Sequence, residues 1–263
     1  MTRAIPQMDP ARPQMDPALP QIDKDPARIA GMFDAIAGRY DLLNTVLSGG
    51  IDRYWRWRAV RSLALTGRET AVDLCTGTAD LVVALAKPGR AARVVGVDFS
   101  PAMLRHGLGK VRARATAAAW QLAQGDAMRL PLATGSADGL TIAFGIRNVR
   151  DHAVAVADCL RVLKPGGRLA ILEISTPRVP VFRQVYAWYF TRLLPRIGRL
   201  VSHHTDAYTY LPASVVGWVT PEAFSATLGA AGFAEVRAVP LTFGAVYLYT
   251  AVRPDHGTKV VQP

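Results

Sequence analysis

A glycine turn and two acidic residues follow two apolar segments at a spacing suited to holding a nucleoside. Asp73 ends the first apolar run, Gly77 lies in the tight turn after it, and Asp98 ends the next apolar run. Gly77 and Asp98 are 21 residues apart. A carboxylate about 20 residues after such a turn can reach the ribose hydroxyls of a nucleotide held at the turn. We therefore expect Asp98 to bind a ribose; the alternative is an acid that only caps a helix or ends a strand.

The acidic residues near this turn narrow the choice of ligand. Asp73 and Asp80 stand on either side of Gly77, where they repel a pyrophosphate and favour a ligand that carries an ammonium or a sulfonium. S-adenosylmethionine carries both of these charges together with an adenosine. The turn therefore predicts this cofactor, with Gly77 and Thr78 bringing backbone close to its methionine part. We expect Thr78 to cap the following helix as well.

Alternating apolar and helical segments are expected to position these residues at one edge of a sheet. Strands are predicted at 71–75, 93–98, 119–123, 139–144 and 168–174, with helices at 79–87, 101–114 and 152–163 between them. A helix at 221–231 then precedes two antiparallel strands near 235–240 and 245–252. This order indicates an α/β fold with a doubly wound, Rossmann-like sheet that is mainly parallel and has an antiparallel C-terminal strand. Ligands of such sheets bind outside the carboxyl ends of the strands.

The segments outside this core have different patterns. Residues 1–25 repeat Pro-Gln-Met-Asp-Pro-Ala, and the frequent prolines predict a disordered tail. A flexible tail is also expected at 254–263, which leaves one domain over 26–253. Within it, residues 26–65 show helical apolar spacing followed by a basic, aromatic helix, and they are expected to form a helical cap over the crevice. Residues 177–219 are expected to form a helical insertion after the fifth strand.

Composition limits the classes of protein that need to be considered. Apolar residues make up 50% of the 263 residues, which excludes general disorder. No apolar run reaches the length of a spanning helix, and no secretory signal is recognisable, so we expect a cytoplasmic protein. The five histidines and two cysteines show no metal-ligand spacing, and no metal is predicted. Cys75, in the glycine turn, is interpreted as a packing residue rather than a nucleophile.

Four sequence strings together resemble the menaquinone/ubiquinone biosynthesis C-methyltransferases, a class I S-adenosylmethionine-dependent family. The resemblance covers roughly residues 28–252. The strings are Tyr40-Asp41-Leu42-Leu43-Asn44 with Ser48 and Trp55, Phe144-Gly145-Ile146-Arg147-Asn148-Val149, Arg161 to Leu169 continuing to Glu173 and Ser175, and Leu194-Pro195-Arg196-Ile197-Gly198 with Tyr208-Thr209-Tyr210-Leu211. Asp52 stands where the first signature usually has His, and Thr76 and Ala79 replace glycines of the usual turn.

The resemblance implies methyl transfer to a ring carbon of a demethylated isoprenoid quinol, with demethylmenaquinol as the expected acceptor. It also implies that Asp126 and Ala127 meet the adenine; the alternative for Asp126 is an ordinary Gly-Asp turn. The expected cofactor-binding residues are Asp73, Gly77, Thr78, Asp98, Phe99, Asp126 and Ala127.

Arg147 is the first candidate for a catalytic residue, because it follows a strand end where it can position a water or a quinol oxygen. The alternative is a salt bridge to Asp151 or Glu173. Tyr40 and Asn44, with Asp41, are the second candidates, and contact between helices explains them equally well.

The insertion suits a long isoprenoid tail. Its aromatic residues are expected to line an apolar channel, and its arginines to face anionic headgroups at the inner face of the membrane. An amphipathic helix packed on the sheet, or the interface of a homodimer, explains the same pattern. The aromatic residues are Phe182, Tyr186, Trp188, Tyr189 and Phe190, and the arginines are Arg178, Arg183, Arg192, Arg196 and Arg199.

Three competing functions share parts of this pattern. A dinucleotide-dependent oxidoreductase needs a Gly-x-Gly-x-x-Gly turn, which the single glycine of this turn does not provide. A nucleic-acid partner is suggested only by the net charge of +11, and the arginines alternate with apolar rather than base-stacking residues. Methylation of another lipophilic or secondary-metabolite acceptor remains the alternative within the same fold.

Overall fold

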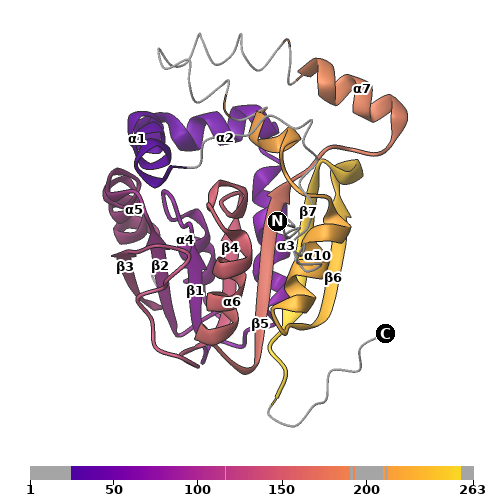
Figure 1. The fold of residues 1–263 in the computed structure, drawn as a ribbon. Helices are drawn as coiled ribbons and strands as arrows, with labels where there is room; N and C mark the ends of the chain where they lie inside the picture. The colour runs from indigo at the N-terminus through magenta and orange to yellow at the C-terminus, as the bar shows by residue number, and fades with distance from the viewer. Residues whose placement is uncertain (1–24, 116, 190–191, 193–209, 211–212, 256–263) are drawn as a thin grey trace, which may run out of the picture.

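A seven-stranded sheet forms the centre of the computed structural model, which describes residues 25–115, 117–189, 192, 210 and 213–255. The strand order is β3-β2-β1-β4-β5-β7-β6 (Figure 1). The strands are β1 (Thr70–Leu74), β2 (Arg93–Asp98), β3 (Ala119–Gln124), β4 (Ala137–Ala143), β5 (Leu163–Ile174), β6 (Ala234–Leu241) and β7 (Val246–Val252). Strands β1 to β5 pair in parallel, whereas β7 runs antiparallel to both β5 and β6. The expected fold class is confirmed.

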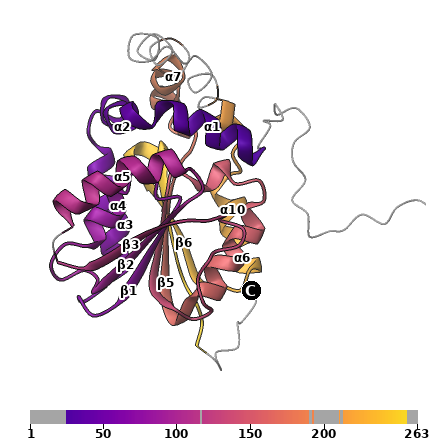
Figure 2. The same cartoon turned by 90° about the vertical axis from the view of Figure 1, so that its left-hand side faces the viewer.

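Helices cover both faces of the sheet. Figure 2 shows α3 (Asp52–Ser62), α4 (Asp80–Leu85) and α5 (Pro101–Arg114) on one face, and α6 (His152–Val162) and α10 (Pro221–Ala230) on the other. Each face has its own buried apolar cluster, because side chains alternate between the two faces of a strand. Val82 and Leu172 belong to the α3–α4 side, and Ile142, Phe224 and Tyr249 to the α6–α10 side.

Short helices lie over the carboxyl ends of the parallel strands. These are α1 (Pro26–Ile36), the 3-10 turn η1 (Ala37–Arg39) and α2 (Tyr40–Ser48), with α7 (Pro180–Trp188) beyond them (Figures 1 and 2). The expected cap over 26–65 therefore has two parts. Its second helix, α3, buries Trp55, Ala59 and Val60 against the sheet.

Two boundaries differ from the expected ones for reasons of backbone geometry. β5 begins at Leu163 rather than at 168, because the Lys-Pro-Gly-Gly segment continues the strand across a register shift opposite Ala137 and Gly139. Gly166 makes this possible, since its φ of +73° lies in the left-handed region. Helix α4 covers only Asp80–Leu85, shorter than the predicted 79–87. Helix α5 begins as expected, with the Ser100 hydroxyl accepting from the Met103 amide at 3.1 Å and Pro101 in the first turn.

Candidate cofactor and acceptor cavities

The turn after β1 has an unusual backbone. Cys75, Gly77 and Ala79 have φ values of +54°, +54° and +65°. The left-handed conformation costs a non-glycine residue about 1–2 kcal/mol, so Ala79, which replaces a glycine of the usual turn, sits in a strained position. Thr76, the other replacement, does not have a positive φ and needs no glycine.

Asp98 ends β2 beside this turn and binds its backbone. The carboxylate accepts from the Gly77 amide at 2.7 Å and from the Ser100 amide at 2.8 Å. Burial raises the pKa of Asp98, although the backbone hydrogen bonds oppose that change. The two amides hold the carboxylate at the carboxyl end of the strand, in the position predicted for a ribose ligand.

A cavity of about 120 Å³ lies against the turn and brings together most of the predicted cofactor-binding residues. Its lining includes Gly77, Asp98, Phe99, Asp126 and Ala127. Asp126 also accepts from the Met128 amide at 2.9 Å, as expected for an Asp in an ordinary turn, so it has both of the predicted properties. We refer to this space as the cofactor cavity.

Asp73 and Thr78, which are also expected to contact the ligand, are not among the residues that line the cofactor cavity. Both oxygens of Asp73 accept from hydroxyls, those of Thr76 at 2.5 Å and Thr141 at 2.7 Å. Burial raises the pKa of Asp73 to about 7, which those hydroxyl contacts only partly offset. Thr78 does not cap α4 either, because Ala79 is the N-cap and makes no side-chain cap bond.

Lys110 contacts both Asp80 and Thr78. Its ammonium lies 2.6 Å from Asp80 and 2.5 Å from Asp41, and it donates to the Thr78 hydroxyl at 3.0 Å. Thr78 in turn donates to Asp41. The charge of Asp80 is therefore paired within the protein, which makes it less available to a cationic ligand than the sequence suggested. The contacts instead connect α2 to α4 and α5.

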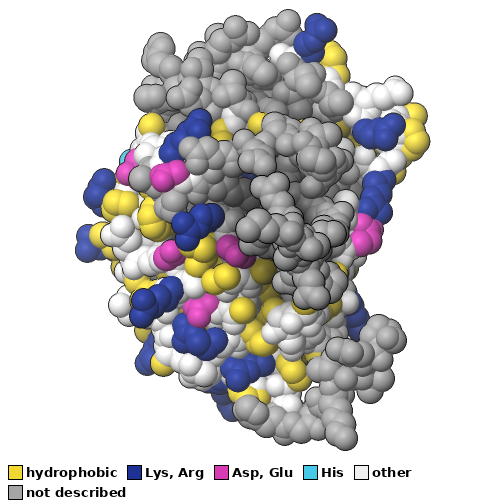
Figure 3. Space-filling view, viewed as in Figure 1, with side chains coloured by type: hydrophobic (Ala, Val, Ile, Leu, Met, Phe, Trp, Pro, Cys, Tyr) yellow, Lys and Arg dark blue, Asp and Glu magenta, His cyan; other side chains and the backbone are white. Residues whose placement is uncertain are grey.

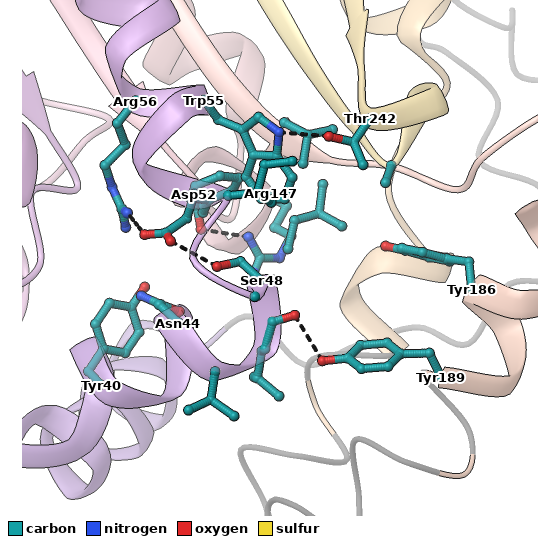
Figure 4. Close-up of a pocket in the computed structure, with 18 of the residues that line it drawn as sticks. Tyr40, Asn44, Ser48, Asp52, Trp55, Arg56, Arg147, Tyr186, Tyr189 and Thr242 are labelled. Carbon is teal, nitrogen blue, oxygen red and sulfur yellow. Dashed lines mark hydrogen bonds and ion pairs between the residues drawn. The ribbon is translucent and has the colours of Figure 1, made fainter.

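A second cavity, of about 530 Å³, lies between α2, α3 and α7, and we refer to it as the acceptor cavity (Figure 4). Its volume falls within the usual range for small-molecule sites. Aromatic and aliphatic side chains predominate in its lining. Figure 4 shows Tyr186 of α7 and Tyr189, the residue after α7, on the opposite side from Tyr40 and Asn44 of α2. The polar groups that line it include Ser48, Asp52, Arg56, Arg147 and Thr242.

Phe33, Tyr40 and Phe144 line both cavities. The Phe33 and Tyr40 rings meet edge to face with centroids 6.1 Å apart. Phe144 has a φ of +60°, and its ring packs against Trp55 at a centroid distance of 6.0 Å. Three aromatic residues therefore lie between the two cavities and belong to the lining of both. Sequence reasoning missed Phe33 and Phe144 in this role, because neither helical spacing nor a motif string indicates which cavity a ring borders.

Arg147 lies at the cavity, as predicted, and it also forms the salt bridge that was the alternative interpretation. It lines the acceptor cavity, yet its Nη1 lies 2.7 Å from Glu173 and 2.6 Å from the Phe144 carbonyl, and its Nε donates to Ser214 at 3.2 Å. Burial alone would lower the pKa of Arg147, but Glu173 and Tyr40 outweigh that effect and raise it. The salt bridge to Glu173 is thus present, whereas Asp151 caps α6 instead.

Tyr40 and Asn44, the second catalytic candidates, lie together at the cap side of the acceptor cavity. Burial raises the pKa of Tyr40, an effect that the neighbouring Asn44 amide and Arg147 charge only partly offset. The buried Nδ2 of Asn44 has no acceptor among the described residues. A ligand that supplies an acceptor would therefore complete the hydrogen bonding of Asn44. Asp41, named with them, is instead engaged by Lys110 and Thr78.

The insertion contributes aromatic residues to the same cavity. Phe182, Tyr186, Trp188 and Tyr189 line it as expected, and Tyr189 donates to the Leu47 carbonyl of α2 at 2.9 Å. The predictions for Phe190, Arg196 and Arg199 concern residues outside the described part. Arg178, one of the arginines expected to face anionic headgroups, forms a salt bridge with Glu222 at 2.5 Å.

One face of α7 is apolar and largely exposed. Val181, Val185 and Trp188, spaced to share one side of the helix, are 74%, 57% and 56% exposed. The neighbouring Phe243 ring, 69% exposed, lies 5.1 Å from that of Phe182. Over the described part of the face in Figure 3, Lys and Arg are instead spread among apolar and acidic side chains.

Three further features bear on the expectations from the sequence. Burial raises the pKa of the Cys75 thiol well above its ordinary value, which fits a packing residue rather than a nucleophile. No group of three or more His, Cys, Asp or Glu in the described ranges could hold a metal ion. Likewise, none of the helices described is long and apolar enough to cross a membrane.

Comparison with known proteins gives consistent matches. The model of the ubiE/COQ5 methyltransferase family matches residues 21–253. A demethylmenaquinone methyltransferase of Thermus thermophilus is 44% identical over 85% of this chain and 100% of its own length. One of Corynebacterium glutamicum (strain R) is 41% identical over 88% and 96%. A Haemonchus contortus phosphoethanolamine N-methyltransferase 2 structure in complex with S-adenosyl-L-methionine shares the fold with a TM-score of 0.53, at 16% identity over 74% of this chain and 52% of that one.

Proposed function

Because the chain belongs to the ubiE/COQ5 methyltransferase family, we propose that it methylates a ring carbon of demethylmenaquinol with S-adenosylmethionine as methyl donor, yielding menaquinol. The relatives that are 41–44% identical over most of their length carry the name of this activity. The structural observation that supports it best is the pair of cavities bordered by Phe33, Tyr40 and Phe144. One cavity offers groups suited to a nucleoside, and the other is large and mostly apolar.

The groups that line the cofactor cavity suit the proposed methyl donor. We propose that Asp98 accepts from the ribose hydroxyls, that the Gly77 backbone lies against the methionine part, and that Asp126 with Ala127 offers the adenine an acceptor beside an apolar surface. Phe99 adds an aromatic side chain to the same lining. When bound, the cofactor supplies an electrophilic methyl group on a sulfonium.

The acceptor cavity fits a quinol ring with the start of its isoprenoid tail. Its aromatic lining matches a flat ring and an apolar chain, and the α7 residues extend that lining away from the cofactor cavity. Tyr40 and Asn44 are proposed to orient the ring from the cap side. Arg147, held by Glu173 and Ser214, is proposed to position a ring oxygen or a water.

Exclusion of water is the second contribution of these residues. The aromatic side chains of Phe33, Tyr40 and Phe144 line both cavities. They are proposed to keep the quinol ring carbon and the methyl group of the cofactor in an apolar region. A positive charge is lost as the methyl group moves, so orientation and a dry environment can supply much of the rate.

We also propose that α7 contacts the inner face of the membrane, where a long-tailed quinol is dissolved. The exposed row of Val181, Val185 and Trp188 supports this, because Val185 and Trp188 also line the acceptor cavity. A tail that leaves the cavity along α7 would thus enter the lipid directly. The net charge of +11 favours an anionic surface. Burial of the same face in a homodimer is the outcome that would oppose this proposal.

The activity is tested by incubating the protein anaerobically with S-adenosylmethionine and chemically reduced demethylmenaquinone, and measuring the mass of the product. The expected product is heavier by one methyl in place of one ring hydrogen. A reduced ubiquinone precursor serves as the parallel acceptor. Cofactor binding without methylation of either quinol would reject the quinol assignment and favour another lipophilic acceptor.

A further inference from the structure

One corner of the acceptor cavity presents hydrogen-bond acceptors. Asp52, in the first turn of α3, is the sole carboxylate among the described residues that line this cavity. Its exposed fraction is 5%, so the carboxylate is almost completely enclosed by protein and cavity. An enclosed carboxylate needs hydrogen-bond donors, and it favours ligands that bring one.

The immediate contacts of Asp52 fix the direction of these hydrogen bonds. Ser48 Oγ donates to Asp52 Oδ1 at 2.8 Å, and Arg56 Nη1 donates to Asp52 Oδ2. The Gly50 amide donates to Ser48 Oγ at 3.2 Å. The Ser48 hydroxyl has a second acceptor within reach, the Thr45 carbonyl at 3.4 Å, but Asp52 is the nearer one. With its proton directed at Asp52 and one lone pair occupied by the Gly50 amide, the serine oxygen has one lone pair left. A carboxylate can accept about four hydrogen bonds, so two positions on Asp52 remain for a ligand.

The two guanidinium groups that line the cavity direct donors at the protein itself. Arg56 pairs with Asp52 and lies 3.4 Å from Asp80. Arg147 donates through Nη1 to Glu173 and through Nε to Ser214. A ligand hydroxyl therefore finds an acceptor at Asp52, whereas a carbonyl oxygen placed there meets lone pairs.

We propose that Asp52, assisted by Ser48, accepts a hydrogen bond from a ring hydroxyl of the acceptor and gives the cavity its preference for hydroquinol over quinone. This inference rests on the proposed function. The reduced and oxidised rings have nearly the same size, so the shape of an apolar cavity separates them poorly. They differ at the oxygens, which are donors in the quinol and only acceptors in the quinone. A site built to hydrogen-bond a hydroxyl rejects an analogue without it, because the buried acceptor is then left unpaired.

The test measures binding rather than turnover. Short-tailed demethylmenaquinol and the same compound oxidised are titrated anaerobically into cofactor-free protein by calorimetry. For wild type we expect a lower Kd for the quinol. Asp52→Asn replaces one acceptor oxygen by a donor, so the ratio of quinone Kd to quinol Kd should fall by about 10- to 100-fold. A ratio within 2-fold of wild type would overturn the proposal.

Two further variants keep the test decisive. Ser48→Ala leaves the carboxylate in place and removes only its assisting hydroxyl, so the ratio should fall by about 3-fold, well short of the fall in Asp52→Asn. A collapse as large as that in Asp52→Asn would move the assignment to Ser48. If Asp52→Asn does not fold, Asp52→His introduces the residue that the family signature usually has. A neutral imidazole offers one donor and one acceptor, so the ratio should fall, and an unchanged ratio would again reject the role of Asp52.

Failure of this inference is distinguishable from failure of the proposed function. If wild-type protein methylates reduced demethylmenaquinone but neither Asp52 variant changes the Kd ratio, the proposed function stands and the role of Asp52 is rejected. Wild-type protein that binds neither redox form and yields no methylated product contradicts both.

Discussion

Individual carboxylates at the end of the sheet have different surroundings, and therefore different expected roles. Asp98 is partly buried and lines a cavity, with two backbone amides holding it. Asp73 is buried, lines neither cavity and accepts from two hydroxyls. Both face the same end of the sheet, so their positions in the sequence did not separate them. The difference lies in the partners: hydroxyls of Thr76 and Thr141 occupy both oxygens of Asp73. We therefore expect Asp98 to govern the binding of the cofactor and Asp73 to govern the pH dependence of stability.

Asp98→Ala should abolish measurable binding of S-adenosylmethionine, because the ribose hydroxyls lose their charged acceptor and the Gly77 amide loses its partner. Losing a charge-assisted hydrogen bond in such a site costs about 1.5–3 kcal/mol per bond, hence more than tenfold in affinity for each. Calorimetric titration measures the effect, and thermal unfolding without ligand checks that the variant is folded. Asp158→Ala, which removes a carboxylate paired with Arg161 on α6, is the matched control and should bind normally. Unchanged affinity of Asp98→Ala would remove Asp98 from the cofactor site.

Asp73 should make the folded protein less stable as pH rises. Its pKa in the folded state is raised to about 7, so the folded state holds a proton that the unfolded chain releases near pH 4. The free energy of unfolding then falls as pH rises from about 4 to about 7, by up to about 4 kcal/mol, and levels off above that. Asp73→Asn removes this slope.

Urea unfolding of both proteins at several pH values between 4.5 and 7.5 tests this expectation. The difference in the free energy of unfolding should shift progressively in favour of Asp73→Asn as pH rises, because every other titrating group is common to both chains. Parallel curves for the two proteins would show that Asp73 keeps an ordinary pKa.

At the scale of elements, the cap is tied to the sheet by charge as well as by apolar contact. Lys110 of α5 reaches Asp41 of α2 and Asp80 of α4, and only 13% of its side chain is exposed. Three helices that are far apart in the sequence therefore depend on one ammonium group. Because α2 carries Tyr40 and Asn44, the position of those residues over the cavities depends on this contact.

Lys110→Met should loosen α2 more than the sheet. The methionine keeps much of the apolar stem but leaves Asp41 without its ammonium partner, so we expect faster hydrogen exchange over 40–48 and weaker cofactor binding, by several-fold. The loss of global stability should be about 1 kcal/mol, since Asp80 keeps Arg56. Lys164→Met, which removes a more exposed ion pair with Asp138 at the start of β5, is the control and should leave exchange in α2 unchanged. Equal protection of α2 in all three proteins would contradict this role of Lys110.

The elements of the core were predictable because their signals are local. The parallel strands follow from the alternation of strand and helix patterns, and the capped start of α5 follows from Ser100-Pro101. The two antiparallel final strands follow from the turn between 241 and 246. The two cavities were not predictable in this way. Their borders come from segments such as α1, α7 and the residues after β4, and only tertiary packing brings those segments together.

The same limit explains why partners at the site could not be assigned from the sequence. Asp80 reads as a charge available to a ligand until Lys110, 30 residues later, is seen to pair with it. For Arg147 the sequence allowed both a catalytic role and a salt bridge to Glu173, and the structure shows the salt bridge, at 2.7 Å from a fully buried Glu173. Removing Arg147 would leave an uncompensated buried carboxylate, so a loss of turnover in Arg147→Ala would not by itself show a catalytic role.

At the scale of the whole molecule, α7 gives one end of the protein an apolar surface. Val181, Val185 and Trp188 lie on that side of the helix, with Phe243 nearby. Burying such side chains in lipid gains about 1.5–3 kcal/mol each, so a few of them together with basic side chains are enough for reversible binding.

Val181→Glu should weaken binding to vesicles of phosphatidylcholine and phosphatidylglycerol by about tenfold or more, because it removes an apolar contact and adds a charge of the same sign as the lipid. Cosedimentation with the vesicles measures the effect. Val154→Glu, at a half-exposed valine of α6, is the matched control and should bind vesicles like wild type. If Val181→Glu instead converts a dimer to a monomer in analytical ultracentrifugation and binds vesicles normally, the α7 face is a subunit interface.

The position of β7 has a consequence for how the chain is made. β7 is later in sequence than β6, yet it lies between β5 and β6 and pairs with both. Until Val246–Val252 has been synthesised and inserted, neither neighbour can close against the other in the native arrangement, and each keeps an unpaired edge. Unpaired edges are templates for pairing with other chains. Nascent chains that stall before β7 should therefore be the aggregation-prone species of this protein, with chaperones needed most at that stage of translation.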